Sequence, residues 1–336
     1  MRSVDGCRAL PRAALLALSG VAMRAWAQVP AGTSALEPAS PTALAIADIA
    51  WTMFIGAALL VVAVTGLLLR AVRGHASPVR PWLWLGGAGV ALPLVVLVAL
   101  MGFSQWRAHA LLAEPPADAL MVSVKGHMWW WEVRYRNPAN GSEVVLANEI
   151  RVPTGRTVRL NLTSADVIHS VWLPTLAGKM DTVPGRVNRL VFSVDAPGVH
   201  RGQCAEFCGQ QHARMALHLV AMAPADFDTW LATQATPAAE PATAQQRMGR
   251  AAFLVQRCNA CHTVRGVSEE GRLAPDLTHV GSRVALGAGL LANDAPAMAQ
   301  WIAHIQQLKP GARMPSYDRL DAATLDAIAA WLKHLQ

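Results

Sequence analysis

Residues 204–215, with the sequence CAEFCGQQHARM, hold two thiols, an imidazole and a thioether within twelve positions. These soft side chains suit copper in an electron-transfer site. Few bulky apolar residues separate them, so packing does not explain the pattern. A Cys204–Cys208 disulfide and a zinc site are the alternatives. A disulfide leaves His212 and Met215 without a role, and zinc has little use for methionine.

A further ligand is needed upstream, and His169 in the segment DVIHSVWLP is the candidate. A single blue-copper centre takes one cysteine, two histidines and a weak axial ligand. This chain offers two cysteines, which can bridge two coppers as thiolates while each metal takes one histidine. Met215 is then a weak axial ligand on one copper, and a backbone carbonyl serves the other.

A second group of candidate ligands lies near the C-terminus. Cys258-Asn-Ala-Cys261-His262 has the spacing for covalent attachment of a c-type haem, with His262 as an iron ligand. Met314 is the expected second axial ligand, because Pro315 restricts it to an extended loop conformation. Met298, in a helical run, is expected to pack in the core. The remaining rival ligands are His279, His304 and His334.

Composition indicates a chain that lies partly in a membrane. The 336 residues are 53% hydrophobic and 15% charged, with a net charge of +7. Residues 114–234 carry eleven basic and eleven acidic side chains, and residues 243–336 carry ten and seven. Neither segment has the surplus of basic residues that is typical of a nucleic-acid-binding domain. Once Cys7 leaves with a signal peptide, every remaining cysteine belongs to one of the two motifs, and none is left for a structural disulfide.

The N-terminal third is expected to export and anchor the chain. Residues 1–27 have a basic start, a short apolar core and an A-x-A cleavage pattern, which are typical of a signal peptide; an uncleaved anchor is the alternative. Residues 28–42 form an irregular tail. Within 43–107, the uncharged runs Ile49–Leu69 and Pro81–Trp106 are long enough to span a bilayer. Their basic connecting loop predicts a cytoplasmic turn, with everything after Arg107 in the periplasm.

The rest of the chain divides into a β-rich and a helical part. Residues 114–234 contain short β-prone runs punctuated by Pro and Gly, which predict a sandwich or barrel. The predicted strands are Leu120–Val124, Met128–Tyr135, Glu143–Leu146, Thr157–Leu162, Val167–Leu173, Arg189–Val194 and Ala216–Ala221. His200 and His218 are interpreted as ordinary histidines. Residues 235–243 form a Pro-containing linker that reaches roughly 28 Å. Residues 244–336 are expected to be helical at Gln246–Arg257, Ala295–Leu308 and Asp321–Leu335.

Three segments carry a resemblance to a known family: HSVWLP at 169–174, KMDTVPGR at 179–186 and the ligand loop at 204–215. They resemble subunit II of haem-copper cytochrome c oxidases, and the C-terminal part resembles class I cytochromes c. The resemblance implies a two-helix transmembrane hairpin, an all-β cupredoxin Greek-key sandwich and an all-α cytochrome c domain. It also implies a dinuclear copper centre, CuA. The implied copper ligands are His169, Cys204, Cys208, His212, Met215 and the Glu206 carbonyl. The Glu206 side chain would then face a magnesium ion shared with subunit I.

The Trp129-Trp130-Trp131 run is expected on one strand, with Trp129 and Trp131 sharing a face. Spacing alone favours core tryptophans. The resemblance instead implies that Trp129 is the residue through which electrons enter CuA. The sequence departs from the family pattern with Met128 in place of Gln and Trp130 in place of Tyr. It also lacks the Glu expected near Gly86, at the start of the second helix.

The resemblance implies an electron-input subunit of an enzyme complex in the bacterial inner membrane. Electrons would pass from haem c through CuA to haem in subunit I, where O2 is reduced with proton translocation. The implied partners are subunit I, subunit III and an upstream cytochrome c or bc1-type donor. The alternatives are the CuA-bearing subunit of a nitric oxide reductase, a copper-delivery protein and a redox sensor. The sequence shows neither the thioredoxin-like pattern of the second nor an output domain for the third.

Overall fold

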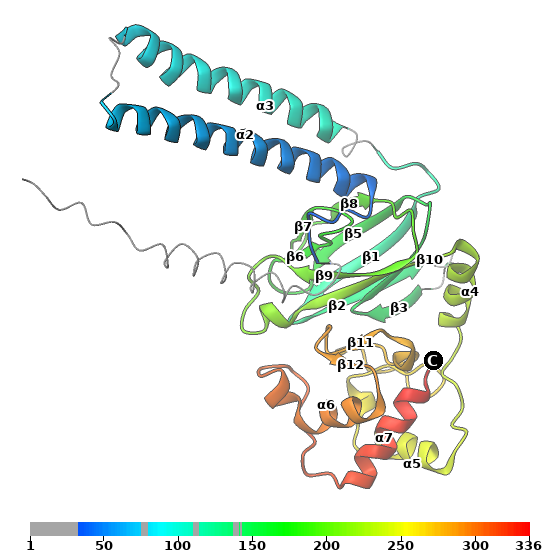
Figure 1. Cartoon of the computed structure of the whole chain (residues 1–336). Coiled ribbons are helices and arrows are strands. Elements are labelled where there is room, and N and C mark those ends of the chain that lie inside the picture. The colour runs from blue at the N-terminus through cyan, green and yellow to red at the C-terminus, as the bar shows by residue number, and fades with distance from the viewer. Residues whose placement is uncertain (1–32, 75–79, 110–113, 137–140, 142) are drawn as a thin grey trace, which may run out of the picture.

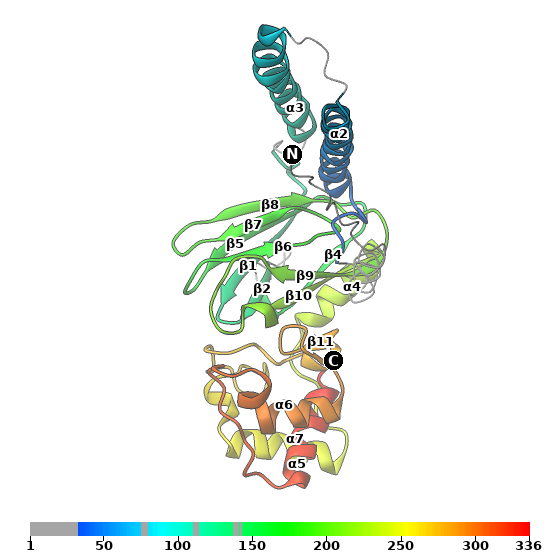
Figure 2. The same cartoon turned by 60° about the vertical axis from the view of Figure 1, so that its left-hand side comes forward.

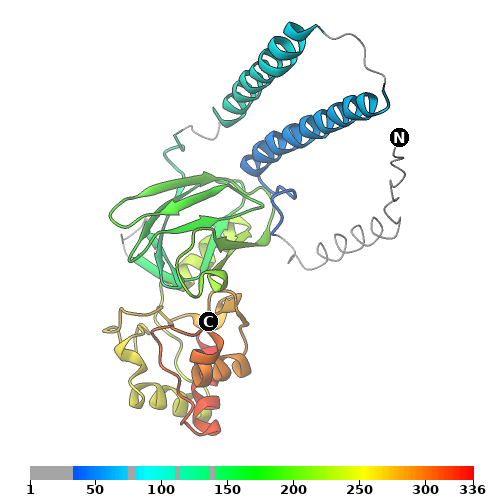
Figure 3. The same ribbon diagram turned by 90° about the vertical axis from the view of Figure 1, so that its left-hand side faces the viewer.

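The computed structural model describes residues 33–74, 80–109, 114–136, 141 and 143–336. The signal peptide predicted at residues 1–27 lies outside these ranges. The described chain has three parts in a row (Figures 1 and 2). Two long helices extend from one end of a β-sandwich, and a small helical domain covers the opposite end. Figure 3 shows the same order from another side.

Two apolar helices form the first part. Helix α2 (Pro41–Val72) and the helical segment Leu83–His109 are long and apolar enough to cross a membrane. Helix α2 contains the first predicted span, Ile49–Leu69, and the second segment covers the other, Pro81–Trp106, from Leu83 onward. The base of α2 is fixed to the sandwich: Ser40 caps the helix and donates to the Leu176 carbonyl, and the Ala39 amide donates to the Thr175 carbonyl at 2.7 Å. The hairpin therefore leaves the sandwich at a defined point.

The second helical segment changes its hydrogen-bond register before Pro93. Leu83–Ala91 (η1) is a π-helix, and α3 (Leu92–His109) continues it. The Leu92 amide donates to the Gly87 carbonyl, five residues back. Proline has no N–H to continue the α-helical ladder, and a local π-turn is one way to accommodate it in an apolar span. Gly86 lies within this π-helical stretch.

The second part is a sandwich of two five-stranded sheets. One sheet has the order β3-β2-β1-β5-β8, and the other has the order β4-β10-β9-β6-β7. In β5, alternate side chains point inward, and Val158, Leu160 and Leu162 are fully buried. The strands are β1 (Leu120–His127), β2 (Trp130–Arg136), β3 (Glu143–Ala147), β4 (Glu149–Pro153), β5 (Val158–Ser164), β6 (His169–Trp172), β7 (Lys179–Thr182), β8 (Asn188–Phe192), β9 (Gly198–Cys204) and β10 (Ala216–Met222).

The sandwich confirms the predicted all-β fold and corrects several details. All seven predicted strands exist, whereas β4, β7, β9 and helix α4 (Pro224–Gln234) were not predicted. The expected strand over all three tryptophans was wrong. Trp129 lies in the turn between β1 and β2, and β2 begins at Trp130. The Trp129 side chain is therefore free of the strand alternation, and it packs against the edge of the sandwich core.

The third part packs three helices around an aromatic core. These are α5 (Ala244–Val255), α6 (Ala295–Leu308) and α7 (Ala322–His334). A capping box between Thr243 and Gln246 starts α5. Helix α5 crosses α7 closely because Gly249 lacks a side chain: a Cβ there would lie 2.0 Å from the Ala327 carbonyl oxygen. The short strands β11 (Ala285–Leu286) and β12 (Leu291–Ala292) face the sandwich (Figure 1).

The segment 235–243 is irregular, and it lies against the helical domain. The Ala238 amide donates to the Arg265 carbonyl at 3.0 Å. Glu240 pairs with Arg250 at 2.7 Å, and its carbonyl accepts from His334. The hydrogen bonds of this segment therefore join it to the domain that follows.

Candidate functional site

The candidate copper ligands come together at the end of the sandwich that faces the helical domain. Cys204 is the last residue of β9 and His169 is the first residue of β6. These strands pair with Val171 opposite Cys204, so both ligands reach the same end of the sheet. The loop after β9 then returns through a 3-10 turn, His212–Arg214 (η2), into β10. Sheet pairing thus fixes the first ligands, and the loop supplies the others.

The distances match a compact cluster of soft ligands. A ring nitrogen of His169 and the sulfurs of Cys204 and Cys208 lie within 4.8 Å of one another. The two sulfurs are 3.8 Å apart, which is too far for a disulfide. From Cys208 Sγ, His212 Nδ1 lies at 3.7 Å and Met215 Sδ at 3.8 Å. The structure therefore brings the five predicted side-chain ligands into one cluster.

One buried nitrogen in this cluster has no hydrogen-bond partner within the described residues. His169 Nε2 is bound to Asp166 Oδ1 at 2.8 Å, whereas Nδ1 is buried and unpaired. A buried polar atom of this kind requires a partner, and Nδ1 is the atom left to face the two thiols. A metal ion between them would satisfy it. The donor set of thiolates, imidazoles and a thioether fits copper.

The two thiols of the cluster differ in acidity. The two thiols are coupled: contact with Cys208 lowers the pKa of Cys204, and the same contact raises that of Cys208. The pair therefore loses one proton readily and keeps the second. Cys204 Sγ also lies 3.2 Å from the Glu206 carbonyl oxygen, so this carbonyl faces the cluster. The Glu206 carboxylate accepts from the Phe207 amide.

Asp166 was not predicted as a site residue, but it orients His169. Its Oδ1 holds His169 Nε2, and its Oδ2 accepts from the Met128 amide at 2.8 Å. Burial acts to raise the pKa of Asp166, but the hydrogen bonds from His169 and the backbone amides outweigh it and lower the pKa. Burial likewise acts to lower the pKa of His169, and the nearby Cys204 thiol and the hydrogen bond to Asp166 raise it. Such carboxylate partners fix the ring orientation of metal-binding histidines.

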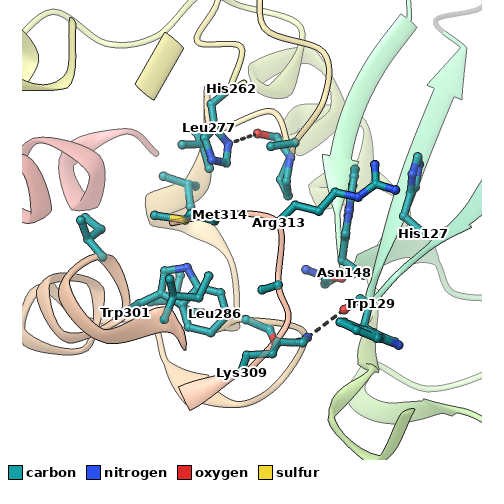
Figure 4. A pocket seen from close by; sticks show the side chains of 18 of the residues that line it. His127, Trp129, Asn148, His262, Leu277, Leu286, Trp301, Lys309, Arg313 and Met314 are labelled. Atoms are coloured by element: carbon teal, nitrogen blue, oxygen red, sulfur yellow. Dashed lines mark hydrogen bonds between the residues drawn. The ribbon is translucent and has the colours of Figure 1, made fainter. Parts of the chain in front are cut away.

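A cavity of about 1190 Å³, counting its open mouth, lies between the helical domain and the sandwich (Figure 4). His262 and Met314 both line it, together with apolar side chains from α6 and the preceding loops. Among the described residues, the histidines that line the cavity are His262 and His127, and His127 belongs to the sandwich. The cavity thus holds the ligand pair predicted for haem.

The orientation of His262 suits an iron ligand. Its Nδ1 lies 2.7 Å from the Pro275 carbonyl and donates to it, which leaves Nε2 free. Burial lowers the pKa of His262, so the ring is neutral and can coordinate. Of the rival ligands, His279 uses both ring nitrogens on the Gln336 and Thr236 carbonyls. His334 donates to Glu240, and His304 does not line the cavity.

The other rival, Met298, is 3% exposed in the helical core and also lines the cavity. Cys258 is half-buried and Cys261 is exposed, and both are free thiols. Cys258 begins the 3-10 turn Cys258–Ala260 (η3), and Cys261 directly precedes His262. The residues present therefore fit a covalently attached c-type haem, with Met314 on the loop after α6 as its second ligand.

Trp129 lies between the cavity and the copper-ligand cluster. It lines the cavity, and its indole Nε1 donates to the Cys208 carbonyl at 2.8 Å. A Cβ on Gly209, the next residue, would lie 3.3 Å from the indole ring. The Trp129 side chain thus lies against both the cavity and the ligand loop at 204–215, called the copper loop below.

Two family models match this chain in the parts that hold these sites. Residues 137–222 match "Cytochrome C oxidase subunit II, periplasmic domain", and residues 246–336 match "Cytochrome c". The chain is 34% identical to cytochrome c oxidase subunit 2 of Alkalihalophilus pseudofirmus over 219 residues, covering 65% of this chain and 62% of that protein. It is 30% identical to the Bacillus subtilis subunit over 229 residues, covering 65% and 63%.

The chain belongs to the cytochrome c oxidase subunit II family. It carries a C-terminal cytochrome c domain. The chain covers less than two thirds of the length of the curated relatives it matches. A solved structure, the periplasmic domain of subunit II of cytochrome oxidase from Bradyrhizobium japonicum, is 32% identical with a TM-score of 0.33. It covers 36% of this chain and 95% of that domain.

Two residues of this subunit II chain that line the cavity were missed by sequence reasoning. Asn148 adopts a positive φ of 61° and accepts from the Trp131 amide at 2.8 Å. Lys309 is 4% exposed, and its ammonium contacts both domains. Asn148 carried a weak signal, since Asn is enriched at positive φ. Nothing near Lys309 in the sequence indicates its partners.

Proposed function

We propose that this chain is the electron-input subunit of a haem-copper cytochrome c oxidase. In this proposal it passes electrons from its own c-type haem to a dinuclear copper centre and on to haem in subunit I. The haem and copper groups supply one-electron redox chemistry when bound. The residues of the chain hold these groups and orient their ligands.

The contacts described above support the following ligand roles. Cys258 and Cys261 attach the haem, and His262 and Met314 coordinate its iron. Copper is held by a set that spans β6 and the loop after β9: His169, Cys204, the Glu206 carbonyl, Cys208, His212 and Met215. Asp166 holds the His169 ring so that Nδ1 faces the thiols.

The position of Trp129 is the single observation that carries this proposal. The indole lines the cavity of His262 and Met314 and donates to the Cys208 carbonyl. A chain that only stored or delivered copper would not need a haem-attachment motif on the far side of this indole. We infer that Trp129 is the residue through which electrons reach the copper loop.

The membrane arrangement is part of the proposal. The two apolar helices anchor the chain in a bacterial inner membrane, and the basic loop between them favours a periplasmic location for both redox domains. Subunit I is the expected acceptor of electrons, and subunit III and a cytochrome c or bc1-type donor are further expected partners. Glu206 is the expected contact to a magnesium ion shared with subunit I. Gly86 stands where the family has a Glu, so we expect proton uptake through subunit I.

Spectroscopy of the full chain, purified in detergent with haem and copper incorporated, tests the proposal. We expect the optical spectrum of a low-spin c-type haem and an electron paramagnetic resonance signal from one electron shared by two equivalent copper nuclei. A haem spectrum with a single-copper signal, or with no copper signal, would contradict the dinuclear assignment. Turnover of the assembled complex with O2 against nitric oxide then separates an oxidase from a nitric oxide reductase.

A further inference from the structure

Lys309 is a buried cation at the boundary between the cytochrome c domain and the sandwich. It directly follows α6 and is 4% exposed. Lysine is almost never buried to this degree unless its charge is satisfied. Burial lowers the pKa of Lys309 to about 7, so its ammonium requires compensating contacts.

Three backbone carbonyls surround the Lys309 ammonium. Nζ donates to Trp129 at 2.8 Å, to Arg214 at 2.9 Å and to Gly287 at 3.1 Å. An ammonium has three N–H donors, so this geometry uses all of them. Trp129 and Arg214 belong to the sandwich, whereas Gly287 lies in the β11–β12 turn of the cytochrome c domain. Figure 4 shows Lys309 reaching across the boundary toward Trp129.

Side chains of the copper loop donate hydrogen bonds to the residues on either side of Lys309. Arg214 Nη1 donates to the Leu308 carbonyl at 2.6 Å, and Gln211 Nε2 donates to the Pro310 carbonyl at 2.8 Å. Gln211 and Arg214 flank the ligand His212. The segment Leu308–Pro310 is therefore attached residue by residue to the loop that supplies copper ligands.

Trp129 is held from two sides in this arrangement. Its indole Nε1 donates to Cys208 in the copper loop, and its carbonyl accepts from Lys309 in the cytochrome c domain. Lys309 also stands five residues before Met314, and both line the haem cavity. A single loop thus carries a haem ligand and the cation that binds the backbone of Trp129.

We propose that Lys309 is a positioning residue that locks the cytochrome c domain in one fixed docked position over Trp129 and the copper loop. The domain then delivers electrons from this position instead of swinging on its linker. This inference rests on the proposed function for its role in electron transfer, but the docking itself is independent of it. Other contacts across the boundary align the domains: the Ala216 amide donates to Ala288, and the Val284 amide donates to Glu149.

These two amides provide a readout of docking that needs no activity. Each is protected from exchange with solvent by an acceptor on the opposite domain, at 3.0 Å for Ala216 and 2.6 Å for Val284. Local opening exposes them at a rate set by the undocked population. Lys309→Met keeps the length of the side chain and removes its donors. Lys309→Gln keeps a polar end and serves as the second variant.

The matched control is Lys333→Met. Lys333 Nζ donates to Gly281 at 2.7 Å within the cytochrome c domain and does not reach the sandwich. We expect both Lys309 variants to increase exchange at Ala216 and Val284 at least tenfold, while exchange in the core of β5 and the haem and copper spectra stay unchanged. Flash-induced electron transfer from haem to copper within the chain should slow at least tenfold. Lys333→Met should change neither quantity.

The outcomes separate this inference from the proposed function. Unchanged exchange and an unchanged transfer rate in both Lys309 variants would overturn the inference. A different result is faster exchange at the two amides in the Lys309 variants, with no electron transfer from haem to copper even in the unsubstituted chain. That result would support the docking role and refute the proposed function. If Lys309→Met fails to fold, the same measurements on Lys309→Gln test the docking role of Lys309.

Discussion

The substitution Gly126→Ala is predicted to damage the copper site without replacing a ligand. Gly126 lies in β1, directly below the His169 ring. A Cβ there would lie 2.6 Å from His169 Cδ2, 3.1 Å from Cγ and 3.2 Å from Thr182 Oγ1. Real Cβ contacts below 3.0 Å are essentially never seen, so the ring must move by at least about 0.4 Å, compared with the ~0.2 Å tolerance of metal–ligand distances.

His169 cannot move freely to relieve this contact. It is fully buried, its Nε2 is held by Asp166, and its ring packs edge-on against Trp131 at 5.8 Å. Overpacking of this kind costs about 1–3 kcal/mol, and disturbing the orientation of a metal ligand weakens binding by roughly 10–100-fold. We therefore expect copper affinity to fall by this factor, with haem binding unchanged.

Competition with a copper chelator measures the affinity, and thermal unfolding of the copper-free protein measures the packing cost. Gly178→Ala is the matched control in the same domain, because its Cβ would lie 3.6 Å from Ile46 Cδ1, an ordinary contact. If Gly126→Ala binds copper as tightly as the unsubstituted chain, His169 does not hold the metal in the described position.

Three further predictions concern the copper pair, its carboxylate partner and the helical domain. Asp166→Asn should lower copper affinity roughly 10–100-fold, because a metal-binding histidine loses its charged partner; an unchanged affinity in chelator competition would count against this role. Because the Cys204–Cys208 pair retains a proton that copper must displace, copper affinity should rise about tenfold per pH unit for each proton released. Copper binding should accordingly weaken as pH falls. If titrations at three pH values gave the same affinity, the thiol pair would not retain a proton that copper displaces. Gly249→Ala should destabilise the helical domain by about 1–3 kcal/mol or more, since its Cβ would meet the Ala327 carbonyl; calorimetry would show whether the midpoint of that domain alone falls.

Sequence analysis predicted the elements in which apolar residues recur with the period of a strand or of a helix. Strand β5 and helix α6 are examples, because their apolar spacing matches one buried face. Strands β7 and β9 have no such pattern. The polar segment Lys179–Thr182 (β7) is a strand because it pairs with β6. In β9, Gly202 leaves room for the Leu173 and Leu217 side chains.

The ligand cluster was predicted from residue types, whereas the residues that support it were not. The spacing of the cysteines and His212 indicates the copper loop by itself. The interaction of Lys309 depends on carbonyls at positions 129, 214 and 287, which only the docked fold brings together. Backbone acceptors carry no sequence signal. Trp129 was expected on a strand because three tryptophans in a row look β-prone, and only the β1–β2 pairing shows that the turn includes it.

Time-resolved electron transfer within the full chain tests the central claim most directly. The haem is reduced by a flash in detergent-solubilised chain that also contains copper, and the absorbance of both centres is followed at several protein concentrations. The account predicts that haem oxidation matches copper reduction in a single first-order step with a rate independent of concentration. A rate proportional to protein concentration, or no transfer from haem to copper, would contradict it.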